Sequence, residues 1–137
     1  MEPDTTAAMM HIGELAERTE LSLRTIRHYD EIGLLKPSGR TDGGFRLYTE
    51  RDFARLMLIR RMKPLGFPLE EMSELLRIID TLEQGDDPEL RAQLDRFVER
   101  AAEQRQKLQR QLDMADEFLA LLHDRSSSGG RSAGRHP

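Results

Sequence analysis

The sequence predicts a mainly α-helical fold with one short β-hairpin and a long C-terminal helix. Two short segments near the start have apolar residues at helical spacing and are separated by a break, which predicts a helix–turn–helix. A turn signal, Asp42-Gly43-Gly44, lies between two short apolar segments and predicts the hairpin. An unbroken helical pattern over residues 88–124 predicts the long helix.

The composition limits the class of protein. A chain of 137 residues is long enough for one small domain and an appendage. It has no cysteine, so disulfides, thiolate metal sites and iron–sulfur clusters are excluded. The N-terminus has no signal-peptide pattern, and no segment approaches a membrane span. We therefore expect a cytoplasmic protein without a membrane partner.

The net charge of −4 is unevenly divided along the chain. Residues 10–70 contain 11 Lys and Arg against 9 Asp and Glu, whereas residues 71–137 contain 10 against 14. The small basic excess in the first half is compatible with a nucleic-acid partner but is too small to identify one. Whether the chain binds nucleic acid has to be judged from the placement of individual side chains.

The predicted helix–turn–helix lies within "IGELAERTELSLRTIRHYDEIGLL", residues 12–35. Ile12 and Leu15 follow helical spacing in its first helix. Ser22 is a suitable N-cap for the second helix, whose apolar face includes Ile26. A glycine then ends this helix and leads into the hairpin segment "LLKPSGRTDGGFRLY".

A second pair of helices follows the hairpin. Thr49 is a suitable cap for the segment "TERDFARLMLIRRMK", and a further helix begins near Leu69 in "LEEMSELLRIIDTL". Each segment carries an apolar stripe, so we expect the two helices to pack against each other. Residues 10–82 are therefore predicted to form one domain, preceded by a flexible N-terminus at residues 1–9.

The long helix starts with Pro88, which suits the first turn of a helix. At ~1.5 Å per residue it would be about 55 Å long, more than a small domain can cover, so it needs a partner helix. Its apolar residues recur near heptad intervals, which predicts a homodimer through a coiled coil. The residues expected in this seam are Leu94, Phe97, Ala101, Leu108, Leu112, Ala115, Leu119 and Leu122. Residues 125–137 are rich in Ser, Gly and Arg and are predicted to be a disordered tail.

The second helix of the helix–turn–helix has an unusual polar face. A helical wheel places Arg24, Thr25 and His28 roughly opposite Leu23 and Ile26. A guanidinium, a hydroxyl and an imidazole on one exposed face can hydrogen bond to base edges and phosphates in a DNA major groove. The hairpin that follows carries two more arginines and suits a wing laid on an adjacent groove. The alternative interpretation is a solvated polar face without a ligand.

Residues 10–76 resemble the winged helix–turn–helix of the MerR family, through "IGELAERT", "RTIRHYDEIGLLKPSGR", "GFRLYTERD" and "LGFPLEEM" in that order. The resemblance implies a dimeric transcription factor that binds a palindromic promoter element and distorts the DNA so that RNA polymerase can engage the promoter. It also implies that the long helix pairs antiparallel with that of a second copy. The DNA contacts that it implies are Arg24, Thr25, His28 and Tyr29 on the recognition helix and Arg40, Arg46 and Tyr48 on the wing.

Three positions depart from the family pattern. Glu20 stands in the turn where glycine is usual, and a left-handed backbone there would carry a strain of about 1–2 kcal/mol. Pro68 replaces the usual Ser cap of the fourth helix, and His11 stands where a Thr or Ser cap is common. These departures concern stability and leave the family resemblance intact.

The sequence leaves the effector open. Family members usually sense a signal with a segment at or beyond the end of the long helix, and here only the predicted tail follows it. A small molecule, a partner protein or no effector at all remain possible. His123 and His136 are more typical of solvated or helix-end histidines than of metal ligands, so we expect no metal and no cofactor.

Three other classes of protein are alternatives to a promoter-specific regulator. An effector-independent architectural protein that bends DNA is the nearest alternative. A coiled-coil adaptor that has lost DNA binding is disfavoured by the retained Arg24, His28 and Arg46. An enzyme is disfavoured because the sequence has no nucleophile–base pair, phosphate loop or metal motif.

Overall fold

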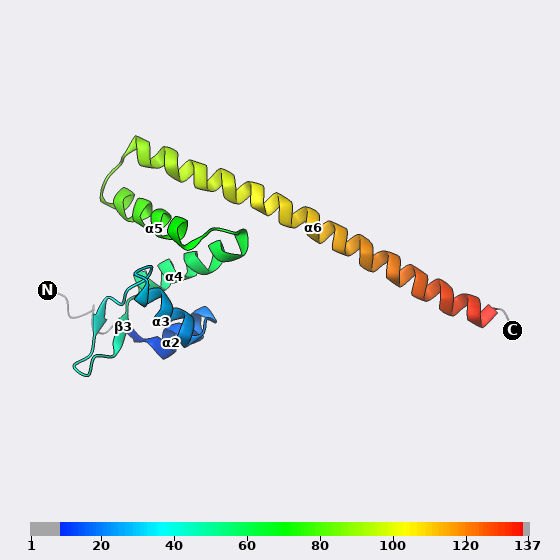
Figure 1. Ribbon diagram of the computed structural model, residues 1–137, viewed down its shortest axis with the longest axis horizontal. Helices are drawn as coiled ribbons and strands as arrows, with labels where there is room; N and C mark the ends of the chain where they lie inside the picture. Colours follow the sequence, from blue (N-terminus) through cyan, green and yellow to red (C-terminus); the bar gives the residue numbers. More distant parts are fainter. Residues whose placement is uncertain (1–8, 136–137) are drawn as a thin grey trace. The chain divides into compact units, whose positions relative to one another are not determined.

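The computed structural model describes the backbone of residues 9–135 and the side chains of residues 9–127. The predicted flexible segment 1–9 lies outside the described residues except for Met9. The chain divides into two units, residues 1–95 and residues 96–137. The elements are β1 (Met10–His11), α2 (Ile12–Thr19), α3 (Leu23–Glu31), β2 (Gly39–Arg40), β3 (Arg46–Tyr48), α4 (Glu50–Met62), the short helix η1 (Lys63–Leu65), α5 (Leu69–Gln84) and α6 (Pro88–Arg135) (Figure 1). The predicted fold class is confirmed.

Helices α2 and α3 form the predicted helix–turn–helix. Leu15 of α2 and Ile26 of α3 are fully buried, as their helical spacing predicts. Ser22 caps α3, because its Oγ accepts a hydrogen bond from the backbone N of Thr25 at 3.0 Å. The turn between the helices contains Glu20, whose φ of 59° and ψ of 29° are left-handed, as the departure from the family glycine suggested.

The sheet has three short antiparallel strands in the order β1-β3-β2. The hairpin of β2 and β3 was predicted, but β1 was not, because two residues are too few to show an alternating pattern. In the register of the sheet, Met10 pairs with Tyr48, and Arg40 lies directly opposite Arg46. The sheet therefore ties the start of α2 to the end of the hairpin.

Helix α4 begins with a capping box. Thr49 Oγ1 accepts from the backbone N of Asp52 at 3.1 Å, and the Asp52 carboxylate accepts from the backbone N of Thr49 at 2.9 Å. Asp52 is buried, and Ser38 donates its hydroxyl to the same carboxylate at 2.6 Å. The cap therefore also connects α4 to the segment that precedes β2.

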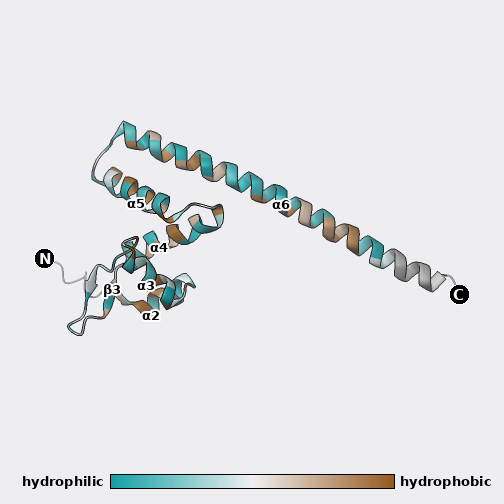
Figure 2. Ribbon diagram, in the orientation of Figure 1, coloured by the Kyte–Doolittle hydropathy of each residue, from teal (hydrophilic) through white to brown (hydrophobic). Residues whose placement is uncertain are grey.

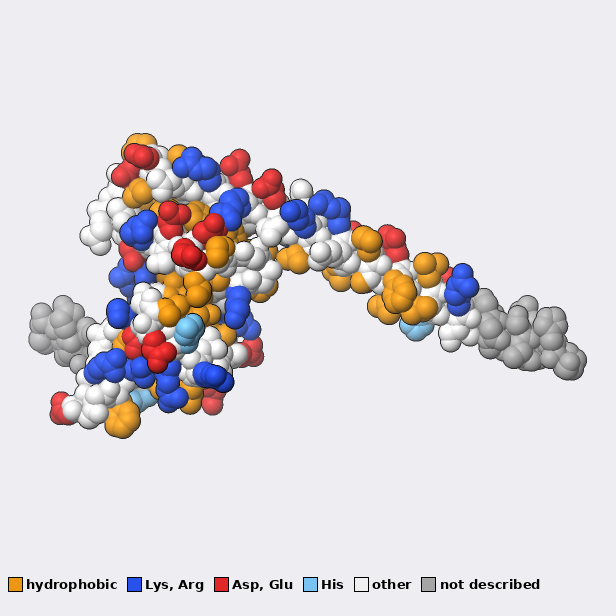
Figure 3. Space-filling view, viewed as in Figure 1, with side chains coloured by type: hydrophobic (Ala, Val, Ile, Leu, Met, Phe, Trp, Pro, Cys, Tyr) orange, Lys and Arg blue, Asp and Glu red, His pale blue; other side chains and the backbone are white. Residues whose placement is uncertain are grey.

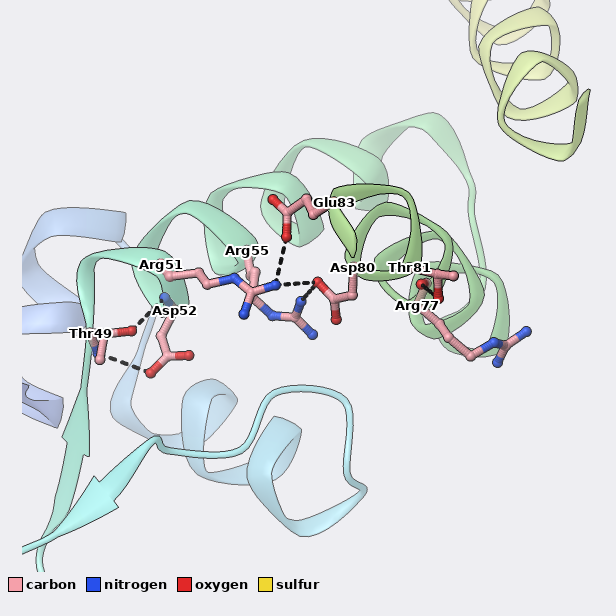
Figure 4. Close-up of polar contacts among 8 residues, drawn as sticks. All are labelled: Thr49, Arg51, Asp52, Arg55, Arg77, Asp80, Thr81 and Glu83. Carbon is pink, nitrogen blue, oxygen red and sulfur yellow. Dashed lines mark hydrogen bonds and ion pairs between the residues drawn. The ribbon is translucent and has the colours of Figure 1, made fainter. Parts of the chain in front are cut away.

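The predicted packing of α4 against α5 is present. Across it, Arg51 and Arg55 of α4 both contact Asp80 of α5, and Arg51 also contacts Glu83 (Figure 4). Pro68 precedes α5 without a side-chain cap, as expected from the sequence. The unit of residues 1–95 is called the compact unit below. Its fully buried apolar side chains are Leu15, Ile26, Leu35, Tyr48, Leu56, Ile59, Met72 and Ile78.

Helix α6 is continuous from Pro88 to Arg135 and extends past the predicted end at Asp124. The prediction stopped where the apolar spacing stops, but apolar spacing reports burial rather than backbone hydrogen bonding. Along α6, Figure 2 shows hydrophobic residues recurring between hydrophilic ones, with a hydrophobic stretch toward the C-terminal end of the coloured part. None of the helices in the described part has the length and apolar character needed to cross a bilayer.

The seam predicted on α6 is mostly exposed in a single chain. Leu108, Leu112, Leu119 and Leu122 have exposed fractions between 42% and 55%. Phe97 is buried, so it does not belong to the exposed stripe. Of the remaining predicted positions, Ala115 is exposed, whereas Leu94 and Ala101 are half-buried.

Candidate nucleic-acid interface

The polar face predicted on α3 is present and accessible. Arg24, Arg27 and His28 are exposed, and Thr25 is half-buried. Ser22 donates its hydroxyl to Thr25 Oγ1 at 2.9 Å, which leaves the Thr25 hydroxyl hydrogen available to an outside acceptor. Two guanidinium groups, an imidazole and a hydroxyl thus project from one short helix.

The two tyrosines implied by the family resemblance lie elsewhere. Tyr29 is only 4% exposed and Tyr48 is 0% exposed. Tyr29 follows Ile26 by three residues, which puts both on the buried face of α3. Burial raises the pKa of both phenols. In this structure both rings belong to the core. The DNA contacts expected of Tyr29 and Tyr48 stay a prediction.

The hydroxyl of Tyr48 is a buried group with an unmet hydrogen-bonding capacity. Its oxygen is inaccessible and has no hydrogen-bond partner among the described residues. The ring lies next to the hairpin arginine Arg46, whose charge lowers the phenol pKa, but burial outweighs that effect. We assign Tyr48 to the core that supports the hairpin.

The two hairpin arginines are held by an acidic residue that the sequence analysis missed. Arg46 donates from Nε to Asp30 Oδ2 at 2.7 Å, and Arg40 donates from Nη2 to the same oxygen at 3.3 Å. The hydrogen bond with Asp30 raises the pKa of Arg46. The side chains of Arg40 and Arg46 are 49% and 24% exposed, so each can still meet a ligand.

A signal for Asp30 was present in the sequence. Asp30 lies four residues after Ile26, on the same buried side of α3, and a buried carboxylate requires a partner. The identity of the partners depends on how the hairpin folds back, which no local pattern gives. Phe45, at the hairpin tip and 70% exposed, is a second surface residue not singled out from the sequence.

The surface around α3 and the hairpin is rich in basic side chains. In Figure 3, Lys and Arg groups gather over the part of the compact unit formed by α2, α3 and the hairpin, with a few acidic groups among them. Such a surface attracts a polyanion. An α-helix fits into the major groove of DNA, where the exposed hydrogen-bond donors of α3 can reach base edges. In the described part of the chain, no cluster of three or more His, Asp or Glu could hold a metal ion.

Comparisons with known proteins agree with this geometry. A family model described as MerR HTH family regulatory protein matches residues 10–78, and a model described as MerR, DNA binding matches residues 53–118. The HTH-type transcriptional regulator ZntR of Escherichia coli is 50% identical over 70 residues, which cover 51% of this chain and 50% of ZntR. The match thus spans about half the length of that relative.

Longer matches also exist. The HTH-type transcriptional regulator CueR of Salmonella typhimurium is 35% identical over 115 residues, covering 82% of this chain and 78% of CueR. Among solved structures, HiNmlR, a MerR family regulator lacking the sensor domain and bound to promoter DNA, aligns with a TM-score of 0.70 at 27% identity. That alignment covers 88% of this chain and 95% of HiNmlR.

Proposed function

Because this chain belongs to the MerR family of helix–turn–helix regulatory proteins, we propose that it binds a palindromic promoter element as a homodimer and distorts the DNA to control transcription initiation. It is a DNA-binding transcriptional regulator and not an enzyme. The observation that supports the proposed promoter binding is the exposed polar face of α3 beside a hairpin with two arginines. We assign the recognition contacts to Arg24, Thr25 and His28 and the wing contacts to Arg40 and Arg46.

The dimer is supported by the exposed leucines of α6. Leu108, Leu112, Leu119 and Leu122 recur at heptad spacing and would be covered by the same stripe of a second copy. A palindromic site follows from that symmetry, because a two-fold dimer presents two identical α3 helices to two half-sites. The two helices are proposed to pair antiparallel.

The proposed regulation places RNA polymerase at the same promoter as a further partner. Distortion of the DNA between the promoter hexamers would change how well the polymerase engages them. An effector would be a small molecule or a partner protein, since the chain has no cysteine to form a thiolate sensor. An architectural DNA-bending protein without an effector is the second candidate, and it shares the same DNA interface.

The experiment begins with a random duplex pool from which the wild-type chain selects its preferred sequence. The proposal expects a two-fold symmetric consensus, bound by a dimer and bent in a gel-phasing assay. Transcription from a promoter that contains this sequence, measured with purified RNA polymerase, separates the two candidates. A change in initiation supports a regulator, whereas bending without such a change supports the architectural role.

Arg24→Ala tests the assignment of α3. A good base contact carries about 1–3 kcal/mol of discrimination, so this variant should lose affinity chiefly for the selected duplex and little for a scrambled one. Arg77→Ala is the matched control, since Arg77 is an exposed arginine on α5 and the change in charge is the same. Equal losses for Arg24→Ala and Arg77→Ala on both duplexes would rule out α3 as the base-contacting helix.

A further inference from the structure

The hairpin register creates a local electrostatic problem. Arg40 on β2 lies directly opposite Arg46 on β3. Like charges at directly opposed positions of an antiparallel pair destabilise the pair. Strand β3 is also anchored by β1 and by the buried Tyr48, but β2 has only two residues and pairs with β3 alone.

Asp30, which lies on a different element, offsets the repulsion between the two arginines. It lies in the last turn of α3, and its side chain is only 10% exposed. A single oxygen, Oδ2, accepts from Arg46 Nε at 2.7 Å and from Arg40 Nη2 at 3.3 Å. A buried carboxylate is stable in its charged form only when it is paired with a cation. The two arginines therefore stabilise the buried Asp30, and Asp30 offsets the repulsion between them.

Arg40 extends the link to the hairpin tip. Its Nη1 donates to the backbone carbonyl of Gly44 at 3.0 Å, and Gly44 has a φ of 86° that favours glycine. The tip is further closed by Thr41, whose backbone N donates to the carbonyl of Phe45 at 2.8 Å. One guanidinium therefore spans from the recognition helix to the end of the hairpin.

Arg46 keeps part of its donor capacity. Its Nε is taken by Asp30, and the Nη atoms have no assigned hydrogen bond among the side chains of residues 9–127. A guanidinium fixed through Nε presents its remaining N–H groups in one direction. Such a group can bind a DNA phosphate only where the backbone passes at a set distance from α3.

We propose that Asp30 is a positioning residue that fixes the hairpin relative to α3 and thereby confines Arg40 and Arg46 to phosphates at one place on the DNA. This inference rests on the proposed DNA interface. Phosphate contacts alone carry no sequence information, but they fix the register of the protein on the duplex. Arginines that move freely would bind phosphates on DNA of any sequence. Arginines held by Asp30 bind phosphates well only when α3 lies over its preferred base sequence.

Asp30→Asn is the test, with Glu31→Gln as the matched control. Glu31 is the neighbouring acid on α3, is exposed, and makes no assigned ion pair or hydrogen bond to either arginine. Both variants lose one negative charge near the interface. Each is titrated against the selected duplex and a scrambled duplex at several salt concentrations.

The expected result differs between the two variants. Asp30→Asn should bind the scrambled duplex more tightly, and its salt slope should steepen by up to about 0.9 for each new phosphate contact. The ratio of selected to scrambled affinity should fall by about tenfold, comparable to the loss of one base contact. Glu31→Gln should shift both affinities together and leave the ratio unchanged. Equal ratios for the two variants would overturn the proposal.

A second measurement needs no DNA. Amide hydrogen exchange at Thr41 and Gly44 reports whether the hairpin is held, and Asp30→Asn should accelerate it while amides in the middle of α4 stay protected. Arg40→Met removes the hydrogen bonds to Asp30 and to the Gly44 carbonyl, and it relieves little repulsion because Asp30 still pairs with Arg46. It should accelerate the same amides even if Asp30→Asn proves poorly folded. Unchanged exchange in both variants would overturn the positioning role. A wild-type chain that prefers no duplex would instead overturn the proposed function, and hairpin exchange would still decide the role of Asp30.

Discussion

Glu20, held in a left-handed conformation between α2 and α3, accepts a hydrogen bond from Arg60 of α4, with 2.9 Å between Oε1 and Nη2. The residue that strains the turn thus also links the turn to the next helix. The Glu20 side chain is 77% exposed, so water screens this ion pair. Strain and ion pair act in opposite directions on stability, and their sizes predict which one dominates.

Glu20→Gly should stabilise the protein slightly. The substitution removes a left-handed strain of about 1–2 kcal/mol, loses an exposed ion pair of about 0–1 kcal/mol, and adds the chain entropy of a glycine, about 0.5–1 kcal/mol. Urea unfolding measures the net change. Glu20→Gln, which loses the charge but keeps the strain, is the control and should be neutral or slightly destabilising. A clear loss of stability in Glu20→Gly would mean that the contact with Arg60 outweighs the strain.

Leu108→Asp should abolish the dimer. Leu108 is 42% exposed in the single chain, and a partner helix at the proposed seam would bury the new charge without a counter-charge. Sedimentation shows whether the dimer is lost, and binding to the selected duplex should fail with it. Gln106→Asp introduces the same residue at an exposed position on the opposite side of α6 and should leave the dimer intact. A dimer that survives Leu108→Asp would place the seam elsewhere.

Glu50 should contribute to stability only above its lowered pKa. Its pKa is lowered mainly by the hydrogen bond from Arg18, with 2.6 Å between Nη1 and Oε2, so the folded state favours the charged carboxylate. This contribution is present above the ordinary glutamate pKa and is lost as the pH falls through the lowered value. Glu50→Gln should therefore melt at a lower temperature than wild type at pH 7 and at the same temperature at strongly acidic pH.

Glu70→Gln is the control for that comparison. Glu70 also lies in the first turn of a helix and makes no ion pair in the described part of the chain. Thermal melts across the acidic range should give this variant nearly the wild-type pH profile. If Glu50→Gln and Glu70→Gln have the same profile, the contact with Arg18 contributes nothing to the acid sensitivity of the fold.

The contacts of Asp80 should be unequal in strength. Arg55 is 24% exposed and Arg51 is 58% exposed, so the Arg55 pair is less screened by water. Double-mutant cycles with Asp80→Asn should give a coupling of about 1 kcal/mol for Arg55 and a few tenths for Arg51. Urea unfolding of the single and double variants measures both. The opposite order would show that Glu83, which shares Arg51, strengthens the outer pair.

Local patterns predicted most of the secondary structure. The Ser22 and Thr49 caps and the spacing of the buried Leu15 and Ile26 are interactions within one or two turns of helix, so the sequence displays them directly. The strand β1 escaped prediction because Met10 and His11 become a strand only by pairing with β3, far along the chain. The formation of this strand therefore depends on a tertiary contact and not on a local sequence pattern.

The candidate site was predicted less completely. The exposed donors of α3 follow from the helical wheel, and Arg24 and His28 are exposed as expected. Tyr29 entered the site through the family resemblance, but it follows Ile26 by three residues on the buried face of α3 and is buried. Asp30 and its two arginines come from separate elements that meet only in the folded domain. Long-range pairing of charges has no local signature.

The pairing of β1 with β3 also has a consequence for the order of folding. Met10 and His11 find their partners at Tyr48 and Leu47, so the whole helix–turn–helix and hairpin lie inside the loop that this pairing closes. Closing a loop of that length costs chain entropy before any contact repays it. During synthesis, α2 and α3 can form from neighbouring residues as they emerge, but the first strand must wait for Tyr48 to leave the ribosome. Completion of the sheet is therefore timed by the synthesis of its last strand.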